Sequence, residues 1–174
     1  MENTDQLVNK VEQSGLVTLD LAEFFPSAPI EIIDLKQYLV QGLVLMEKPF
    51  REALKATDWS QFNDKTVGIT CTTDAIIPLW AYMLLTTYLQ PHAATVYYGN
   101  KEQVEEQLLA DAIAAIDEKK YKDAKVVIKG CGERSIPAAA FIGITRKLRP
   151  VVRSLMYGEP CSTVPIYKNA LTKT

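Results

Sequence analysis

The order of apolar and polar residues predicts strands and helices in alternation. Short apolar runs suit buried strands, and longer stretches with apolar residues every three or four positions suit amphipathic helices. The predicted strands are 17–21, 43–46, 67–70, 94–98, 126–129 and 151–157. The predicted helices are 4–14, 47–57, 76–89, 102–119 and 136–148. Residues 30–35 fit a strand or the start of a helix, 36–42 favour a helix, and 158–165 is predicted to be a loop before a polar tail.

A segment in the middle of the chain returns later at a constant offset. Val67 corresponds to Val126, because 126 − 67 = 59, and the same offset pairs Tyr98 with Tyr157. The correspondence runs without a gap through a strand, a helix and the next strand. A β-α-β pattern that occurs twice predicts parallel strands joined by right-handed crossovers, with helices on both faces of the sheet.

The predicted fold is therefore α/β, with three layers (α/β/α) and one mainly parallel sheet of about five strands. Two pseudo-repeated β-α-β units occupy about 58–100 and 117–159. An N-terminal extension, 1–42, precedes them, and its strands could add to an edge of the sheet. The chain length favours a single domain over 1–174.

Cysteines and carboxylates follow the carboxyl ends of the predicted strands, where open parallel sheets bind ligands. The sequence thus predicts a small-ligand or metal site, and its candidates are Cys71, Asp74, Cys131, Glu133, Glu159 and Cys161. Thiolates and carboxylates are ligands of Zn²⁺, so zinc is the candidate metal. Two other interpretations stay open. Cys71 could be a packed small hydrophobe, and Asp74 and Glu133 could cap helices.

The loop around Cys131 offers further chemistry. Gly130 and Gly132 flank this cysteine just before a predicted helix, so backbone N–H groups there could hold an anion. A thiol at a helix N-terminus could also act as a thiolate nucleophile. The loop lacks the third glycine of a dinucleotide fingerprint and a Walker lysine. No reaction or substrate is specified.

A second hypothesis is a non-enzymatic interaction module or homodimeric scaffold with structural cysteines. The helix predicted at 136–148 is small-sided and could pair with its own copy through Ala138, Ala139, Ala140 and Gly143. The aromatic residues Tyr82 and Tyr98 lie on core-like elements, where packing is the expected role.

Composition limits the binding partners and the cellular compartment that we expect. The net charge is −2, which argues against nucleic acid or an anionic membrane as the main partner. The longest apolar run, Ala75 to Leu89, falls short of the roughly 18 residues of a membrane-spanning segment. The start is polar, unlike a signal peptide, and three cysteines imply no disulfide framework. We therefore expect a cytoplasmic protein whose partners are a small molecule, a metal ion or a second copy.

Three segments together resemble a known family. They are Ile69-Thr70-Cys71 with Asp74, Gly130-Cys131-Gly132, and Gly158-Glu159-Pro160-Cys161-Ser162-Thr163-Val164-Pro165. Over nearly the whole chain the sequence is similar to the domain of unknown function 2480, a family of the Bacteroidetes lineage. The resemblance implies a small cytoplasmic bacterial protein. It implies no particular activity, cofactor or catalytic residue.

Overall fold

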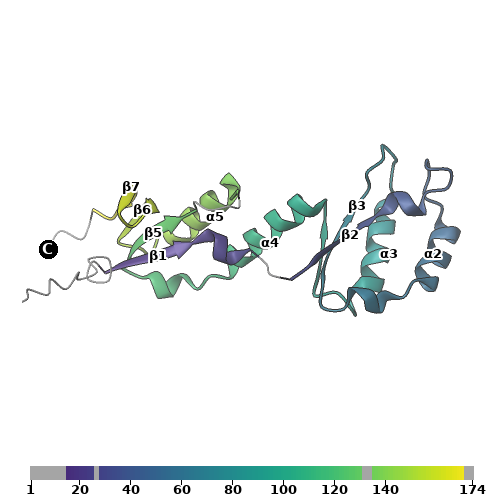
Figure 1. Cartoon of the computed structure of the whole chain (residues 1–174), viewed down its shortest axis with the longest axis horizontal. Helices are drawn as coiled ribbons and strands as arrows, with labels where there is room; N and C mark the ends of the chain where they lie inside the picture. The colour runs from purple at the N-terminus through teal and green to yellow at the C-terminus, as the bar shows by residue number, and fades with distance from the viewer. Residues whose placement is uncertain (1–14, 26–27, 131–134, 171–174) are drawn as a thin grey trace, which may run out of the picture. The chain divides into compact units, whose positions relative to one another are not determined.

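The chain forms two compact units, each with its own sheet and hydrophobic core. The structure, a computed structural model, describes residues 15–25, 28–130 and 135–170 (Figure 1). We call Met1–Phe25 with Leu109–Thr174 unit 1, and Pro26–Leu108 unit 2. The expectation of one sheet of about five strands is wrong, because the described strands form one sheet of four and another of three.

Unit 2 holds the three-stranded sheet. Its strands β2 (Ile30–Asp34), β3 (Thr66–Thr70) and β4 (Thr95–Tyr98) are parallel, in the order β2-β3-β4. Helices α2 (Glu47–Ala56) and α3 (Leu79–Leu89) pack against it. The buried core contains Ile33, Leu35, Phe50, Leu54, Val67, Ile69, Leu85 and Leu89.

Unit 1 holds the four-stranded sheet. Strands β1 (Leu16–Asp20), β5 (Lys125–Lys129) and β6 (Ser154–Glu159) are parallel, and β7 (Ser162–Lys168) runs antiparallel to β6. The helix α5 (Ala138–Leu148) follows β5. The buried core contains Leu19, Leu21, Leu109, Ile113, Val126, Ile128, Ile144, Leu148 and Leu155.

The boundary between the units falls within α4 (Lys101–Ala115). Leu109 and Ile113 in its second half belong to the core of unit 1. Val104 in its first half is buried in unit 2, where it lies against Gly68 of β3.

The prediction that N-terminal strands add to sheet edges is confirmed. β1 pairs in parallel with β5, and β2 pairs in parallel with β3. Each is followed by a short 3₁₀ helix capped by an aspartate: Asp20 accepts from the Ala22 N–H and Asp34 from the Lys36 N–H, both at 2.9 Å. The two N-terminal strands therefore belong to different sheets.

Matching elements of the two units begin 59 residues apart. This holds for β3 and β5 (125 − 66 = 59), for α3 and α5 (138 − 79 = 59), and for β4 and β6 (154 − 95 = 59). The turn residues Asp64 and Asp123 also share a left-handed backbone, with φ of 60° and 58°.

Two predicted elements are wrong near turns. Residues 43–46 are not a strand: Gln41 and Gly42 take positive φ values, and the chain reverses so that the Val40 N–H donates to the Val44 carbonyl. Residues 158–165 are not only a loop, since β7 begins at 162. Pro165 argued against a strand in the sequence. In the structure it is tolerated, because proline is compatible with an edge strand or a position beside a bulge.

Helix bounds differ where prolines and aspartates intervene. The predicted helices 76–89 and 136–148 begin at Leu79 and Ala138, because each follows a proline and the residue before a proline avoids the helical region. The predicted helix 102–119 ends at Ala115, and Asp117 then caps a separate 3₁₀ helix. None of the helices in the described ranges is both long and apolar enough to span a bilayer.

Candidate functional site

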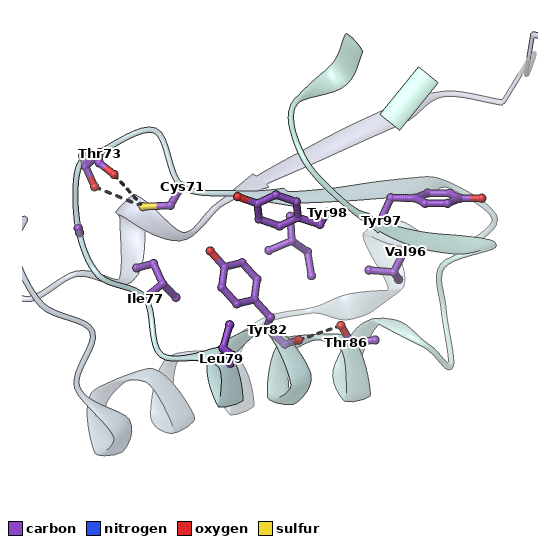
Figure 2. Close-up of a pocket in the computed structure, with 11 residues that line it drawn as sticks. Cys71, Thr73, Ile77, Leu79, Tyr82, Thr86, Val96, Tyr97 and Tyr98 are labelled. Atoms are coloured by element: carbon purple, nitrogen blue, oxygen red, sulfur yellow. Dashed lines mark hydrogen bonds between the residues drawn. The ribbon is translucent and has the colours of Figure 1, made fainter. Parts of the chain in front are cut away.

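A cavity of about 580 Å³ opens at the carboxyl edge of the unit 2 sheet. Its walls come from the ends of β3 and β4, from the segment that leads to α3, and from α3 itself (Figure 2). The wall residues include Ile69, Cys71, Thr73, Tyr82, Thr86, Val96, Tyr97 and Tyr98. We call this space the unit 2 cavity.

One end of the unit 2 cavity is polar. In Figure 2 the hydroxyl groups of Tyr82 and Tyr98 point toward the end that holds Cys71. The two tyrosine rings meet edge-on, with centroids 5.7 Å apart, and Tyr82 interacts electrostatically with both Tyr98 and Cys71. Two phenols and one thiol therefore gather at one end of a mainly apolar space.

The thiol of Cys71 is held by its own loop. Its Sγ donates to the carbonyl of Thr73 at 3.7 Å and lies 3.3 Å from the Thr73 hydroxyl oxygen. Cys71 follows β3 directly and is half-buried, with its side chain in the cavity wall. Helix α3 begins only at Leu79, so this thiol is not at a helix N-terminus.

Burial raises the pKa of Tyr82 above its ordinary value of 10.0, and the neighbouring Tyr98 and Cys71 add to this effect. A nearby negative charge disfavours ionisation of a phenol, so both neighbours act on Tyr82 in the same direction as its burial. Among the described residues that line the cavity, none is acidic or basic. The site therefore presents neutral hydrogen-bonding groups.

The predicted site residues are distributed over both units. Asp74 follows Cys71 in unit 2 but is exposed, outside the cavity wall. Its expected capping role is wrong, because the residue that precedes α3 is Pro78. Glu159 ends β6 in unit 1, and Cys161 is exposed in the turn before β7.

The premise that these residues share one sheet edge is wrong, because the strands that carry them form two sheets. Gly130 follows β5 in unit 1, whereas Cys131, Gly132 and Glu133 lie outside the described residues. In the described ranges, no group of three or more His, Cys, Asp or Glu side chains could hold a metal ion such as zinc.

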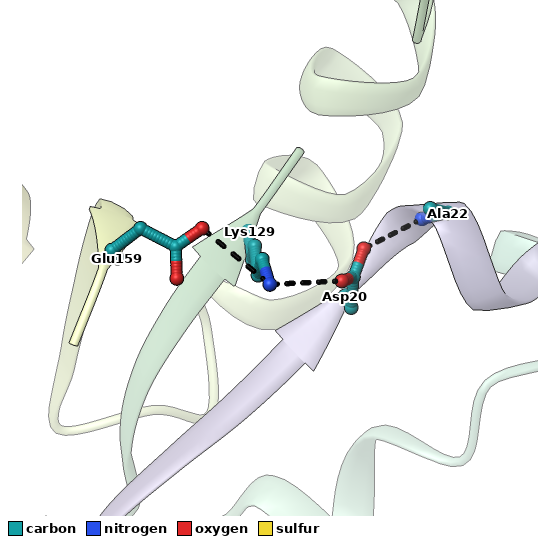
Figure 3. Close-up of polar contacts among 4 residues, drawn as sticks. All are labelled: Asp20, Ala22, Lys129 and Glu159. Carbon is teal, nitrogen blue, oxygen red and sulfur yellow. Dashed lines mark hydrogen bonds and ion pairs between the residues drawn. The ribbon is translucent and has the colours of Figure 1, made fainter. Parts of the chain in front are cut away.

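The carboxyl edge of the unit 1 sheet carries an ion-pair group that the sequence analysis missed. Lys129 Nζ lies 3.6 Å from Asp20 Oδ2 and 3.5 Å from Glu159 Oε1 (Figure 3). These carboxylates raise the pKa of Lys129, and Glu159 has the larger effect. The signal was accessible in principle, because Asp20, Lys129 and Glu159 end three neighbouring parallel strands.

Unit 1 has a smaller cavity at the matching place, with a volume of about 220 Å³. We call it the unit 1 cavity. It is lined by Ile128, Phe141, Thr145, Leu155, Met156, Tyr157 and Ile166. The first six lie 59 residues after Ile69, Tyr82, Thr86, Val96, Tyr97 and Tyr98 of the unit 2 cavity. The seventh, Ile166, comes from β7.

The unit 1 cavity lacks two of the polar groups of its counterpart. Phe141 stands where unit 2 has Tyr82, and Gly130 stands where unit 2 has Cys71. A Cβ at Gly130 would collide with the ring of Phe141. The ring pair itself is the same in both units, since Phe141 meets Tyr157 edge-on with centroids 5.6 Å apart.

The helix face proposed for pairing between copies packs partly within unit 1. Ala140 is buried in the core, and a Cβ on Gly143 would lie 3.7 Å from Ile113. From the sequence, packing was the expected role of Tyr82 and Tyr98. The tyrosine-to-phenylalanine difference between positions 82 and 141 was the available signal for a polar cavity.

These observations define a mixed α/β protein with two mainly parallel sheets and a cavity at the carboxyl edge of one of them. The chain belongs to the DUF2480 family, described as proteins of unknown function, whose sequence profile matches residues 5–169. The resemblance stated from the sequence is therefore confirmed. No curated protein and no solved structure matches the chain significantly.

Proposed function

We propose that the protein binds a small, neutral and largely apolar molecule in the unit 2 cavity. The ligand directs one hydrogen-bonding group toward Cys71, Tyr82 and Tyr98. Its apolar part lies against the side chains of Ile69, Val96 and Thr86. We also propose that the two units are copies of one β-α-β element, of which unit 2 carries the binding function.

The size and the chemistry of the cavity support this function. Small-molecule sites have volumes of roughly 300–1,000 Å³, with apolar and aromatic walls and a few polar groups that orient the ligand. The unit 2 cavity, at about 580 Å³, lies within this range. The unit 1 cavity, at about 220 Å³, lies below it.

The main support for the proposal is the difference in polar groups between the two cavities. Both have the same edge-on ring pair and the same aliphatic floor, Ile69 in one and Ile128 in the other. In unit 1, Phe141 makes this ring contact without a hydroxyl. Unit 2 thus adds the Tyr82 hydroxyl and the thiol of Cys71, which its own loop holds, at the end of a space large enough for a ligand.

The charges around the cavity favour a neutral ligand. An anionic ligand would meet Tyr82, whose ionisation burial already disfavours, without a cation among the described lining residues. A ligand with a carbonyl oxygen suits this end, since tyrosine hydroxyls donate hydrogen bonds.

The test uses Nile red, a neutral aromatic dye with a carbonyl acceptor. We expect its fluorescence to rise and shift to the blue on binding the full chain. Tyr82→Phe should weaken binding about five-fold, as expected for one lost hydrogen bond worth ~1 kcal/mol. The control is Phe141→Tyr, which adds a hydroxyl to the unit 1 cavity and should leave the affinity unchanged. Equal affinities for all three proteins, or no binding, would contradict the proposal.

Thiol labelling gives a second readout. In a Cys131→Ser background, a maleimide should react with the exposed Cys161 faster than with the half-buried Cys71. Saturating Nile red should then slow the labelling of Cys71 and leave Cys161 unaffected, because only Cys71 lines the cavity. If the dye slowed the labelling of neither cysteine, it would bind outside the unit 2 cavity.

A further inference from the structure

The segment that leads from β3 to α3 presents alternate residues to the unit 2 cavity. The residues of this segment that line the cavity are Cys71, Thr73, Ala75, Ile77 and Leu79. Between them, Thr72, Asp74 and Ile76 are exposed and stand outside the wall. A period of two is typical of an extended chain, whose successive side chains point to opposite sides. Contacts that fix the outward side of this segment therefore also fix which side chains face a ligand.

The outward side is fixed at Thr72 by Asp34, the last residue of β2. The Thr72 N–H donates to Asp34 Oδ1 at 3.1 Å, and the Thr72 hydroxyl donates to Asp34 Oδ2. Asp34 pairs in register with Thr70, the last residue of β3. One carboxylate at the end of β2 thus holds the segment at the point where it leaves β3.

These contacts exceed what helix capping requires. Asp34 also caps the 3₁₀ helix that follows β2, where its Oδ1 accepts from the Lys36 N–H. Asp20 has the same capping role after β1 in unit 1, and its other oxygen lies 3.6 Å from Lys129 Nζ. In unit 2 the other oxygen takes the hydroxyl of Thr72 instead. The capping aspartate of the unit with the polar cavity is therefore tied to the cavity segment.

Asp34 holds Thr72 as a carboxylate. Burial acts to raise its pKa, but the hydrogen bonds from Thr72 and the Lys36 N–H, together with the charge of Lys36, hold the pKa below its ordinary value of 3.8. Hydrogen bonds to an ionised acceptor are stronger than those between neutral groups. At neutral pH the segment is therefore held by the stronger kind of hydrogen bond.

We infer that Asp34 is a positioning residue of the unit 2 cavity and acts through Thr72. By holding Thr72 outside, it directs Cys71 and Thr73 into the wall, where Cys71 Sγ donates to the Thr73 carbonyl (Figure 2). The inference rests on the proposed function of this cavity, because the group that Asp34 positions is the thiol that meets the ligand. Without the Thr72 hydroxyl, the thiol loses its fixed place beside Tyr82.

The first test compares affinities for Nile red at neutral pH. Thr72→Val keeps the shape of the side chain and removes the hydroxyl. It should weaken binding about three-fold or more, because the ligand must then order the segment itself. Thr72→Ser restores the hydroxyl and should bind as tightly as wild type.

The matched control is Ser60→Ala. The Ser60 hydroxyl donates to Asp58 at 2.7 Å, so this variant also loses a hydroxyl–aspartate hydrogen bond in unit 2. Neither residue lines the cavity. Ser60→Ala should therefore leave the affinity unchanged.

A double-mutant cycle connects the effect to Asp34. Asp34→Asn keeps an oxygen for the backbone N–H groups and removes the charge. It should weaken dye binding in the wild-type background and have little further effect in Thr72→Val, because residues that act through one contact are not additive.

Thiol labelling is a second test and needs no ligand. In the Cys131→Ser background, Thr72→Val should speed the reaction of a maleimide with Cys71 about three-fold or more, because a segment held by fewer hydrogen bonds opens more often. The exposed Cys161 is the internal reference, and its rate should not change. Ser60→Ala should leave both rates unchanged.

Equal effects of Thr72→Val and Ser60→Ala would overturn the inference, as would a failure of Thr72→Ser to restore binding. The ligand proposal fails separately. Faster labelling of Cys71 in Thr72→Val without Tyr82-dependent dye binding would count against the ligand proposal alone. Tyr82-dependent dye binding that Thr72→Val leaves unchanged would count against the role of Asp34 alone.

Discussion

The ring of Tyr82 on α3 meets the ring of Tyr98 on β4 edge-on, with centroids 5.7 Å apart and planes at 70°. Phe141 and Tyr157 repeat this relationship in unit 1, at 5.6 Å and 79°. Edge-on contacts are a preferred geometry for aromatic rings. The pair joins a helix to a strand in both units, so the hydroxyl of Tyr82 is an addition to a packing contact that works without it.

The alkaline stability of the protein should depend on Tyr82. Its pKa is raised in the folded chain, so as the pH rises above 10.0 the unfolded chain loses this proton first. The unfolded state then binds fewer protons than the folded state, and stability falls with rising pH. Tyr82→Phe should reduce this fall in urea unfolding measured from neutral to alkaline pH. Identical pH dependence of the two proteins would contradict the assignment.

The acid stability should depend on Asp34. Burial acts to raise its pKa, but hydrogen bonds from Thr72 and from the Lys36 N–H outweigh it and hold the pKa below 3.8. The Thr72 hydroxyl donates to Oδ2, and the Thr72 N–H donates to Oδ1 at 3.1 Å. A lowered pKa stabilises the fold above the unfolded pKa, and this is lost as the pH falls through the folded value.

Thr72→Val removes the hydroxyl and keeps the backbone bond. We expect the pKa of Asp34 to rise and the stability at neutral pH to drop, while the loss of stability on acidification becomes smaller. Urea unfolding at neutral and acidic pH, with carbon-detected titration of Asp34, measures both effects. An unchanged Asp34 titration would refute this account.

Gly68 should be intolerant of a side chain. An added Cβ would lie 2.6 Å from Ile32 Cδ1, 2.8 Å from Val104 Cγ2 and 3.0 Å from the backbone oxygen of Gly99. Gly68→Ala should lower the free energy of unfolding by about 1–3 kcal/mol, the usual cost of overpacking. Gly143→Ala is the control, since its nearest contact would be an ordinary 3.7 Å. Equal stabilities of the two variants, measured by urea unfolding, would contradict the proposed packing.

Lys129 should stabilise unit 1 in a salt-dependent manner. It ends β5, between the carboxylates that end β1 and β6, and those two carboxylates would otherwise repel each other. Lys129→Met should lower the urea midpoint at low salt, and added salt should shrink the difference, because partly exposed charges are screened. The control is Lys65→Met, which removes one ion pair, with Glu31, and should have a smaller effect. A salt-independent loss for Lys129→Met would indicate packing rather than charge.

The local pattern was a reliable guide where elements are continuous and bounded by clear signals. The strands at Thr66–Thr70 and Lys125–Lys129 and the helix at Glu47–Ala56 were predicted nearly to the residue. The strand at Ser162–Lys168 was missed because it contains Pro165, which argues against a strand. Proline is compatible with an edge strand, and only the pairing with β6 identifies this segment as one. The candidate site was predicted in part: Cys71 lines the cavity, whereas packing was the expected role of Tyr82 and Tyr98.

By itself, the sequence determined the alternation of strands and helices, the spacing of 59 residues between matching segments, and the family. These follow from side-chain periodicity and local backbone preference, which act over a few neighbouring residues. Only the tertiary structure decided that β1 and β2 enter different sheets, and that Tyr82, Tyr98 and Cys71 meet at one cavity. Strand partners are chosen by burial and hydrogen bonding between residues distant in the chain, and no local pattern encodes that choice.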